Sequence, residues 1–287
     1  MIAIVCALHS EARPLIDQLA LKRVEGVREF PLFIADSHAL VVSGVGKIKS
    51  AVATTRLISY LQDQHKLVPC ECVATNIGIA GAARSTRLLG ELALAAQVTD
   101  DAAGRSFYSD LLLRSKIPLA DVSTFDEPVL RRRLPLAEIR ALDLVDMEAS
   151  AFFEAAQRFL NPSQIYCFKI VSDYLEGAYL DKQRVSQMVA AHIEDIMYYL
   201  SSQRELLSHR QKDSNVLTSS DNELLDRIAG RLKLTRTQQH KLHELALSYR
   251  VRTGNGVWHL KPYADLTVST SDDRKRTFGE LSRTLSE

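Results

Sequence analysis

Residues 71–82 read ECVATNIGIAGA, an apolar run that ends in a cluster of small residues. Its first half has the composition of a buried strand, so we expect a strand over residues 71–77. Gly78 and Gly81 follow, and no side chain from Asn76 to Ala82 can do acid–base chemistry. Small residues at such a place predict either a tight turn or a group that approaches this backbone closely.

Similar apolar runs recur along the first 203 residues and alternate with helical patterns. Such alternation predicts an α/β fold, in which helices cover the faces of a sheet. We expect further strands over residues 2–8, 30–34, 40–43, 91–98, 143–146 and 165–172. We expect helices that begin near Ser10, Lys47, Met147 and Arg184.

The composition excludes several classes of protein. The chain has 287 residues, of which 46% are hydrophobic and 25% charged, so it can bury a sizeable core. A net charge of +1 gives no overall field that favours nucleic acid or an anionic membrane. No apolar stretch approaches the roughly 20 residues of a membrane span, and the N-terminus lacks the features of a signal peptide. Four cysteines without metal-binding spacing indicate buried thiols, so we expect a cytoplasmic protein.

The composition changes after residue 204. Residues 208–222 are polar and read as a linker, and helical patterns follow over 223–234 and 236–250. We therefore expect two domains, 1–204 and 205–287, the second small and mostly helical. Its excess of basic residues is small, so we expect a packing or partner-binding role and no nucleic-acid binding.

Three acidic residues, Glu11, Glu148 and Asp173, follow expected strands. Each alone could be a residue of a helix first turn or an N-cap. In open α/β sheets, however, ligands bind in the crevice at the carboxyl ends of the strands. We therefore expect the three carboxylates to surround one pocket.

A second glycine pair, Gly44 and Gly46 in SGVGKIKSA, lies between an expected strand and an expected helix. It is not a Walker loop, because Lys47 is followed by Ile48 and not by Ser or Thr. Both glycine segments can still offer backbone N–H groups to an oxygen-rich ligand. The eight histidines show no metal-binding spacing, so we expect no metal and no cofactor.

The ordered set IAIVCALHSEA, VVSGVGKIKSA, NIGIAGA, GELALA, LVDMEASA and IVSD resembles the nucleoside phosphorylase and nucleosidase superfamily. Within it, the resemblance is to the 5′-methylthioadenosine/S-adenosylhomocysteine nucleosidase and futalosine hydrolase branch, and it covers residues 1 to about 203. It implies a three-layer phosphorylase/hydrolase-like fold with a central mixed sheet, to which the small helical region is added. It also implies a nucleoside ligand and at least a homodimer.

The resemblance implies roles for single residues. Asp173, oriented by Ser172, matches the acid that protonates the departing purine, and Glu11 matches the base that activates water. Glu148 matches the carboxylate that binds the ribose hydroxyls, and Met147 matches the residue that packs under the sugar. The other substrate-binding candidates are Gly44, Gly78, Gly81 and Phe125, the last for stacking on the base.

This chain carries Ile79 where relatives carry a serine, which removes a hydroxyl that could hold phosphate. We therefore expect hydrolysis of the N-glycosidic bond of a purine nucleoside. Phosphorolysis is one alternative, with Arg13, Arg56 and Arg84 as candidates to hold phosphate. Another is a catalytically weak nucleoside-binding protein that acts through its C-terminal domain.

The 5′ side of the substrate is left open. Residues 104–118 are candidates to form the base or 5′ pocket, and Phe107 and Tyr108 would suit an apolar 5′ group.

Overall fold

The computed structural model describes all residues except 28, 66, 68–71, 85, 114, 134, 178–180, 214–216, 267, 269 and 287. Its contacts divide the chain into two compact units, Met1–Ser208 and His209–Glu287. The first residue of the strand expected over 71–77 lies outside the described residues, as does Cys70. Across the described part of the chain, no helix is long and apolar enough to cross a membrane.

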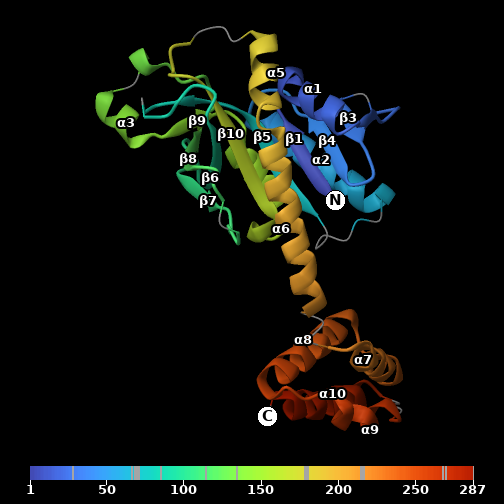
Figure 1. Ribbon diagram of the computed structural model, residues 1–287. Coiled ribbons are helices and arrows are strands. Elements are labelled where there is room, and N and C mark those ends of the chain that lie inside the picture. Colours follow the sequence, from blue (N-terminus) through green and yellow to red (C-terminus); the bar gives the residue numbers. More distant parts are fainter. Residues whose placement is uncertain are drawn as a thin grey trace. The chain divides into compact units, whose positions relative to one another are not determined.

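A mixed sheet, ten-stranded within the described residues, forms the centre of the first unit (Figure 1). Its strands are β1 (Ile2–Cys6), β2 (Lys22–Arg23), β3 (Leu32–Ile34), β4 (His38–Val42), β5 (Val73–Ala82), β6 (Leu92–Asp100), β7 (Arg105–Tyr108), β8 (Leu119–Thr124), β9 (Leu144–Asp146) and β10 (Ile165–Asp173). Their order is β10-β6-β8-β9-β5-β1-β4-β3-β2, with β7 beside β6 and a further pairing of β10 with β5. Strands β5, β9, β8, β6 and β10 therefore close into a ring, from which β1 leads into an open sheet.

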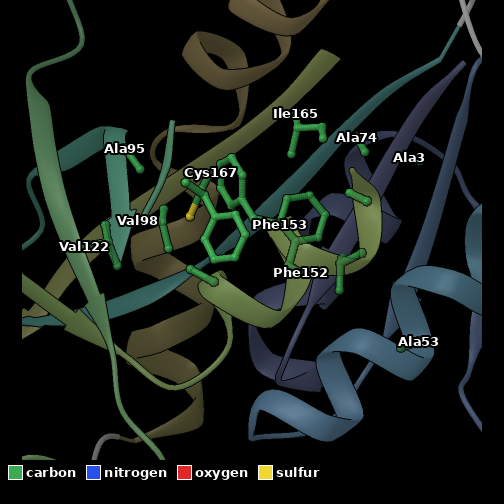
Figure 2. Close-up of a cluster of buried hydrophobic side chains, with 14 of the residues drawn as sticks. Ala3, Ala53, Ala74, Ala95, Val98, Val122, Phe152, Phe153, Ile165 and Cys167 are labelled. Carbon is green, nitrogen blue, oxygen red and sulfur yellow. The ribbon is translucent and has the colours of Figure 1, made fainter. Parts of the chain in front are cut away.

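Helices cover both faces of this sheet. On one face pack α2 (Lys47–His65) and α4 (Ala149–Ala156), and on the other α1 (His9–Gln18), α5 (Lys182–Ala190) and α6 (Ile193–Asp213). Short α3 (Leu136–Ala141) precedes β9. Figure 2 shows Phe152 and Phe153 of α4 among strand side chains in the core on the α2 and α4 side. These layers confirm the expected three-layer α/β fold with a central mixed sheet.

Strand β1 shows why the sequence pattern revealed the sheet. Ile2 and Ile4 belong to the core under α1, whereas Ala3 and Val5 belong to the core under α2. Because both faces of the strand are buried, its sequence is apolar at every position. The short, partly exposed strands β2, β7 and β8 lack this signal and were not expected from the sequence.

The strand expected over residues 71–77 was predicted to end too early, and of the two alternatives for NIGIAGA, a tight turn or a close approach to the backbone, the structure shows the second. Strand β5 runs on through Ala82, because β10 pairs with it as far as Gly81. Neither Gly78 nor Gly81 has a positive φ. Gly78 and Gly81 therefore allow other side chains to approach this strand closely, and no turn is present here.

The second unit consists of helices. They are α7 (Ser219–Arg231), α8 (Arg236–Thr253), α9 (Lys261–Ala264) and α10 (Ser271–Ser286), packed around a core of their own. Asp221 is buried beneath them and accepts hydrogen bonds from Thr218 N, Val257 N and the Arg250 guanidinium. Helices are confirmed at both expected places, over 223–234 and 236–250, although α7 ends at Arg231 and α8 runs on to Thr253.

One expectation for this region was wrong. Residues 208–222 do not form a linker throughout, because α6 continues to Asp213 and α7 begins at Ser219. The Arg, Gln and Lys residues that made the stretch look like a linker are also good helix formers. Near the C-terminal end, a polar segment forms α10, in which the apolar residues Leu281 and Leu285 are buried.

Candidate active site

A cavity of about 260 Å³ opens at the carboxyl ends of β1, β5, β9 and β10. Six of the nine residues expected to act on substrate line it: Glu11, Gly81, Met147, Glu148, Ser172 and Asp173. The rest of its wall is mostly apolar and is formed by Ala7, Leu8, Val45, Ile79, Ala80, Pro128, Val129, Leu130, Val145, Asp146, Leu175 and Gly177. The three acids that lie far apart in sequence thus share one cavity.

Glu11 lies in the first turn of α1, directly after β1, and is only 2% exposed. Its Oε2 accepts a hydrogen bond from Leu8 N at 2.8 Å, and its Oε1 accepts one from Ile79 N at 2.9 Å. Burial raises the pKa of this carboxyl, and these amides act against that rise. A Cβ on Gly78 would lie 2.8 Å from Glu11 Oε1, so the small residue makes room for the acid.

Asp173 ends β10, just after an irregularity in its pairing with β5. Its Oδ1 accepts a hydrogen bond from Leu175 N at 2.8 Å, and the Ser172 hydroxyl lies 2.7 Å from its Oδ2. A Cβ on Gly81 would overlap Leu175 Cδ2 and lie 3.3 Å from Asp173 Oδ1. The expected contact between Ser172 and Asp173 is therefore present, and Gly81 leaves space for it.

Glu148 immediately precedes α4 and is 7% exposed. Its Oε1 accepts a hydrogen bond from Gly46 N at 2.8 Å, across the turn between β4 and α2. Burial raises the pKa of Glu148 to about 7, with a further contribution from the negative charge of Asp146. Both the protonated and the ionised form of Glu148 are therefore populated near neutral pH.

Sequence reasoning missed a buried ion pair behind this wall. The Lys169 ammonium, 1% exposed on β10, lies 2.7 Å from Asp146 Oδ2 and 2.7 Å from Asn76 Oδ1. A signal was available, since a lysine inside the apolar run IYCFKIVS needs a buried partner. The sequence could not show which acid that partner was.

Three of the expected substrate-binding residues lie outside the cavity wall. Gly44 sits in the turn before α2, with φ +81°, while its neighbour Val45 lines the cavity. Gly78 lies behind Glu11. Phe125 packs, partly buried, against a small cluster that includes Ile139 and the cavity-lining residues Val145 and Leu175, and its stacking on the base stays a prediction.

The residues considered for the 5′ side and for phosphate also lie elsewhere. Phe107 packs against Phe153 with ring centroids 6.1 Å apart, and Tyr108 is 58% exposed. Arg13 pairs with Asp17 in an exposed contact, and the Arg84 guanidinium donates to Leu142 O. Neither these residues nor Arg56 are part of the cavity wall. Apolar burial explains Phe107 better than a ligand contact does.

The segment after β8 forms another part of the wall, with Pro128, Val129 and Leu130. The Arg131 guanidinium anchors it, because it donates to Ala83 O and Tyr174 O. At its other end, Asp126 pairs with Lys47 of α2 at 2.9 Å. Among the residues that the structure describes, no group of His, Cys, Asp or Glu has the arrangement of a metal site.

No protein-family model matches this chain, and no curated protein matches its sequence. Solved structures match its fold. A 5′-methylthioadenosine/S-adenosylhomocysteine nucleosidase from Colwellia psychrerythraea in complex with adenine is 19% identical, covers 70% of this chain and 94% of its own, and gives a TM-score of 0.54. The corresponding enzyme of Campylobacter jejuni is 19% identical, covers 69% and 97%, and gives 0.52.

The Arabidopsis thaliana 5′-methylthioadenosine nucleosidase in apo form is 17% identical, covers 70% of this chain and 95% of its own, and gives a TM-score of 0.57. At these identities the likeness concerns the fold. All three structures are matched over nearly their full length, which leaves about 30% of this chain outside the match. The chain therefore has, over most of its length, the fold of the solved methylthioadenosine/S-adenosylhomocysteine nucleosidases.

Proposed function

We propose that this protein hydrolyses the N-glycosidic bond of a purine nucleoside and releases the free base and the sugar. The observation that carries the proposal is the convergence of Glu11, Glu148 and Asp173 on one cavity. Two acids on either side of a glycosidic bond can protonate the leaving group and activate water. Both the family resemblance and the fold of the solved nucleosidases support this assignment.

In this mechanism Asp173 delivers a proton to the departing purine, while the Ser172 hydroxyl holds its carboxyl group in place. Glu11 takes a proton from the attacking water. Its two amide contacts hold Glu11 in a fixed orientation, and its burial makes it a stronger base than a solvated carboxylate. Glu148 binds the ribose hydroxyls, and Met147 packs beneath the sugar.

Water is favoured over phosphate by the charges of the wall. Glu11, Asp146, Glu148 and Asp173 all line the cavity, and the described lining residues include no Lys, Arg or His. A phosphate dianion would be repelled by the ionised forms of Glu11 and Glu148, whereas the charge of Asp146 is balanced by Lys169. Ile79, which lines the cavity with an apolar side chain, offers no hydroxyl to hold phosphate.

The substrate we propose is an adenosine-type nucleoside. The apolar residues of the wall include Ala7, Leu8, Val45 and Met147, and solved nucleosidases of this fold are named for methylthioadenosine and S-adenosylhomocysteine. Three apolar residues on and before α2 are exposed, namely Val45, which also lines the cavity, Ile48 and Val52, and they support assembly into a homodimer.

The test is product analysis with the purified full chain. Methylthioadenosine, S-adenosylhomocysteine, 5′-deoxyadenosine and a futalosine-like nucleoside are incubated with and without phosphate, and base and sugar are quantified. We expect free base and free sugar at equal rates in both buffers. A sugar 1-phosphate as product would assign phosphorolysis, and tight nucleoside binding without base release over hours would remove the enzymatic proposal.

A further inference from the structure

We propose that Lys169 is a positioning residue of this cavity: through Asp146 and Asn76 its ammonium orients the segment that carries Glu148 and supplies a positive charge to Glu148 and Glu11. This inference deepens the proposed function and rests on it for its catalytic meaning. The buried ion pair itself and its effect on the acids can be measured without turnover.

Lys169 joins four strands at one point. Its ammonium lies 2.7 Å from Asp146 Oδ2 on β9 and 2.7 Å from Asn76 Oδ1 on β5. The Asn76 amide in turn donates to Val5 O on β1 at 3.1 Å. Lys169 itself belongs to β10, four residues before Asp173, and is not part of the cavity wall. Its influence on substrate must therefore pass through its neighbours.

Asp146 is the neighbour that reaches the catalytic segment. Its Oδ2, the atom that contacts Lys169, also accepts hydrogen bonds from Glu148 N at 3.2 Å and Ala149 N at 2.8 Å. Its Oδ1 accepts a hydrogen bond from the Thr124 hydroxyl at 2.7 Å. Asp146 thus fixes the backbone of Glu148 at the start of α4, and the Lys169 ammonium fixes Asp146.

The same ammonium acts on the acids by its charge. The pKa of Lys169 is raised, because burial, which lowers it, is outweighed by Asp146, Cys167 and Glu148. Burial raises the pKa of Glu11 and of Glu148, and Asp146 raises that of Glu148 further. The Lys169 charge acts in the opposite direction on both acids and so keeps a larger fraction of each ionised.

Stability alone does not account for this pair. Removing two charges from water is costly, and replacing a buried ion pair by apolar residues of similar volume is often neutral or stabilising. A charged pair enclosed directly behind a cavity lined by acids is instead typical of a site whose ionisation is tuned. The titratable and charged groups that act on Glu148 include Asp146 from β9, Lys169 and Cys167 from β10 and Glu11 from α1, and the Gly46 amide before α2 donates to it.

The experiment is a double-mutant cycle read by NMR titration. Wild type, Lys169→Met, Asp146→Asn and the double variant are prepared with glutamate ¹³C-labelled at the carboxyl carbon, and Glu148→Gln assigns the Glu148 signal. We expect the Glu148 midpoint to rise by about one to two pH units in Lys169→Met and to fall in Asp146→Asn. In the double variant both charges are absent, so the midpoint should return close to that of wild type.

Lys169→Arg keeps the charge and should leave the midpoint within a few tenths of a unit of wild type. Lys22→Met removes an exposed lysine of β2 and serves as the matched control, with no shift expected. If Lys169→Met does not fold, the Glu148 midpoint should still be lower in Asp146→Asn than in the double variant and wild type. Equal midpoints in wild type and Asp146→Asn would overturn the proposal, as would an unchanged midpoint in folded Lys169→Met.

Activity provides the second measurement. In the pH profile of kcat/KM, the acid limb should shift among the variants in the same order as the Glu148 midpoint. A merely structural loss would lower kcat/KM at every pH without shifting this limb. If the wild type releases no base from any nucleoside, the proposed function fails while the titration remains readable. If the wild type is active and the titration order is absent, this inference alone fails.

Discussion

The two glycine segments of this protein look alike in sequence and differ in structure. In SGVGKIKSA, Gly44 and Gly46 have φ values of +81° and +105° and form the turn from β4 into α2. In NIGIAGA, Gly78 and Gly81 lie inside the extended strand β5, without positive φ. Glycine is required at Gly44 and Gly46 by the backbone conformation, and at Gly78 and Gly81 by the side chains that pack against them.

Both segments hold acids, but in different ways. The turn offers one amide, Gly46 N, to Glu148, whereas the strand offers the Ile79 amide to Glu11 and leaves space beside Gly78 and Gly81 for Glu11 and Asp173. Substitutions in the turn should therefore act mainly on stability. Substitutions in the strand should act mainly on the position of the acids, and hence on turnover.

The largest effect is expected at the acid that lies over Gly81. Asp173→Asn keeps the size of the side chain and removes the proton that the departing base needs, so kcat should fall by about 10²- to 10⁴-fold with little change in substrate affinity. Stopped-time assays of base release and calorimetric binding measure the two quantities. Asp121→Asn, an exposed position on β8, is the matched control. Wild-type turnover by Asp173→Asn would remove Asp173 from the mechanism.

Glu148, which is held by a single amide of the turn, should make stability depend on pH. Its pKa is about 7 in the folded protein, above that of an unfolded glutamate, because of burial first and Asp146 second. The folded state therefore binds more protons between about pH 4.5 and 7, and stability should be highest below this window and decrease as pH rises through it.

Glu148→Gln should abolish that decrease, which is on the order of 3 kcal/mol. Urea unfolding of both proteins at pH 5 and pH 8 measures the difference in the free energy of unfolding. A difference between wild type and variant that stays constant across this range would contradict the pKa assigned to Glu148.

Gly78→Ala tests the strand. Extended backbone accepts alanine, but the new Cβ would lie 2.8 Å from Glu11 Oε1 and push the carboxylate from its place. We expect kcat/KM to fall by roughly 10- to 100-fold, because small displacements of a catalytic group are costly. The urea midpoint should change little. If activity falls only in proportion to the amount of folded protein, the proposed difference between the strand glycines, which position the acids, and the turn glycines, which affect stability, is refuted.

Gly46→Ala tests the turn and should give the smallest effect. Alanine at φ +105° is strained by about 1–2 kcal/mol, which should appear as a lower free energy of unfolding. Because the strained turn carries the amide that binds Glu148, KM for a ribonucleoside should also rise. Gly26→Ala, at φ +80° with open space around its Cβ, should show the same kind of strain with KM unchanged.

Local patterns in the sequence predicted much of this protein. Buried strands such as β1 and β10 are apolar at almost every position, so their existence could be read directly. Glu11, Glu148 and Asp173 were predictable as neighbours because each follows such a strand at its carboxyl end. Short edge strands and the polar α10 carried too few apolar residues to be recognised.

The sequence by itself determined the α/β class, the carboxyl edge at which the acids lie and the helical nature of the second unit, since these follow from local composition and periodicity. Only the tertiary structure decided that β5 continues through its glycines, that Phe125 packs against a small buried cluster and that Lys169 pairs with Asp146. Each of these features depends on which side chains from distant segments pack together or form ion pairs. Packing and desolvation decide which of these contacts form, and neither can be read from a local sequence pattern.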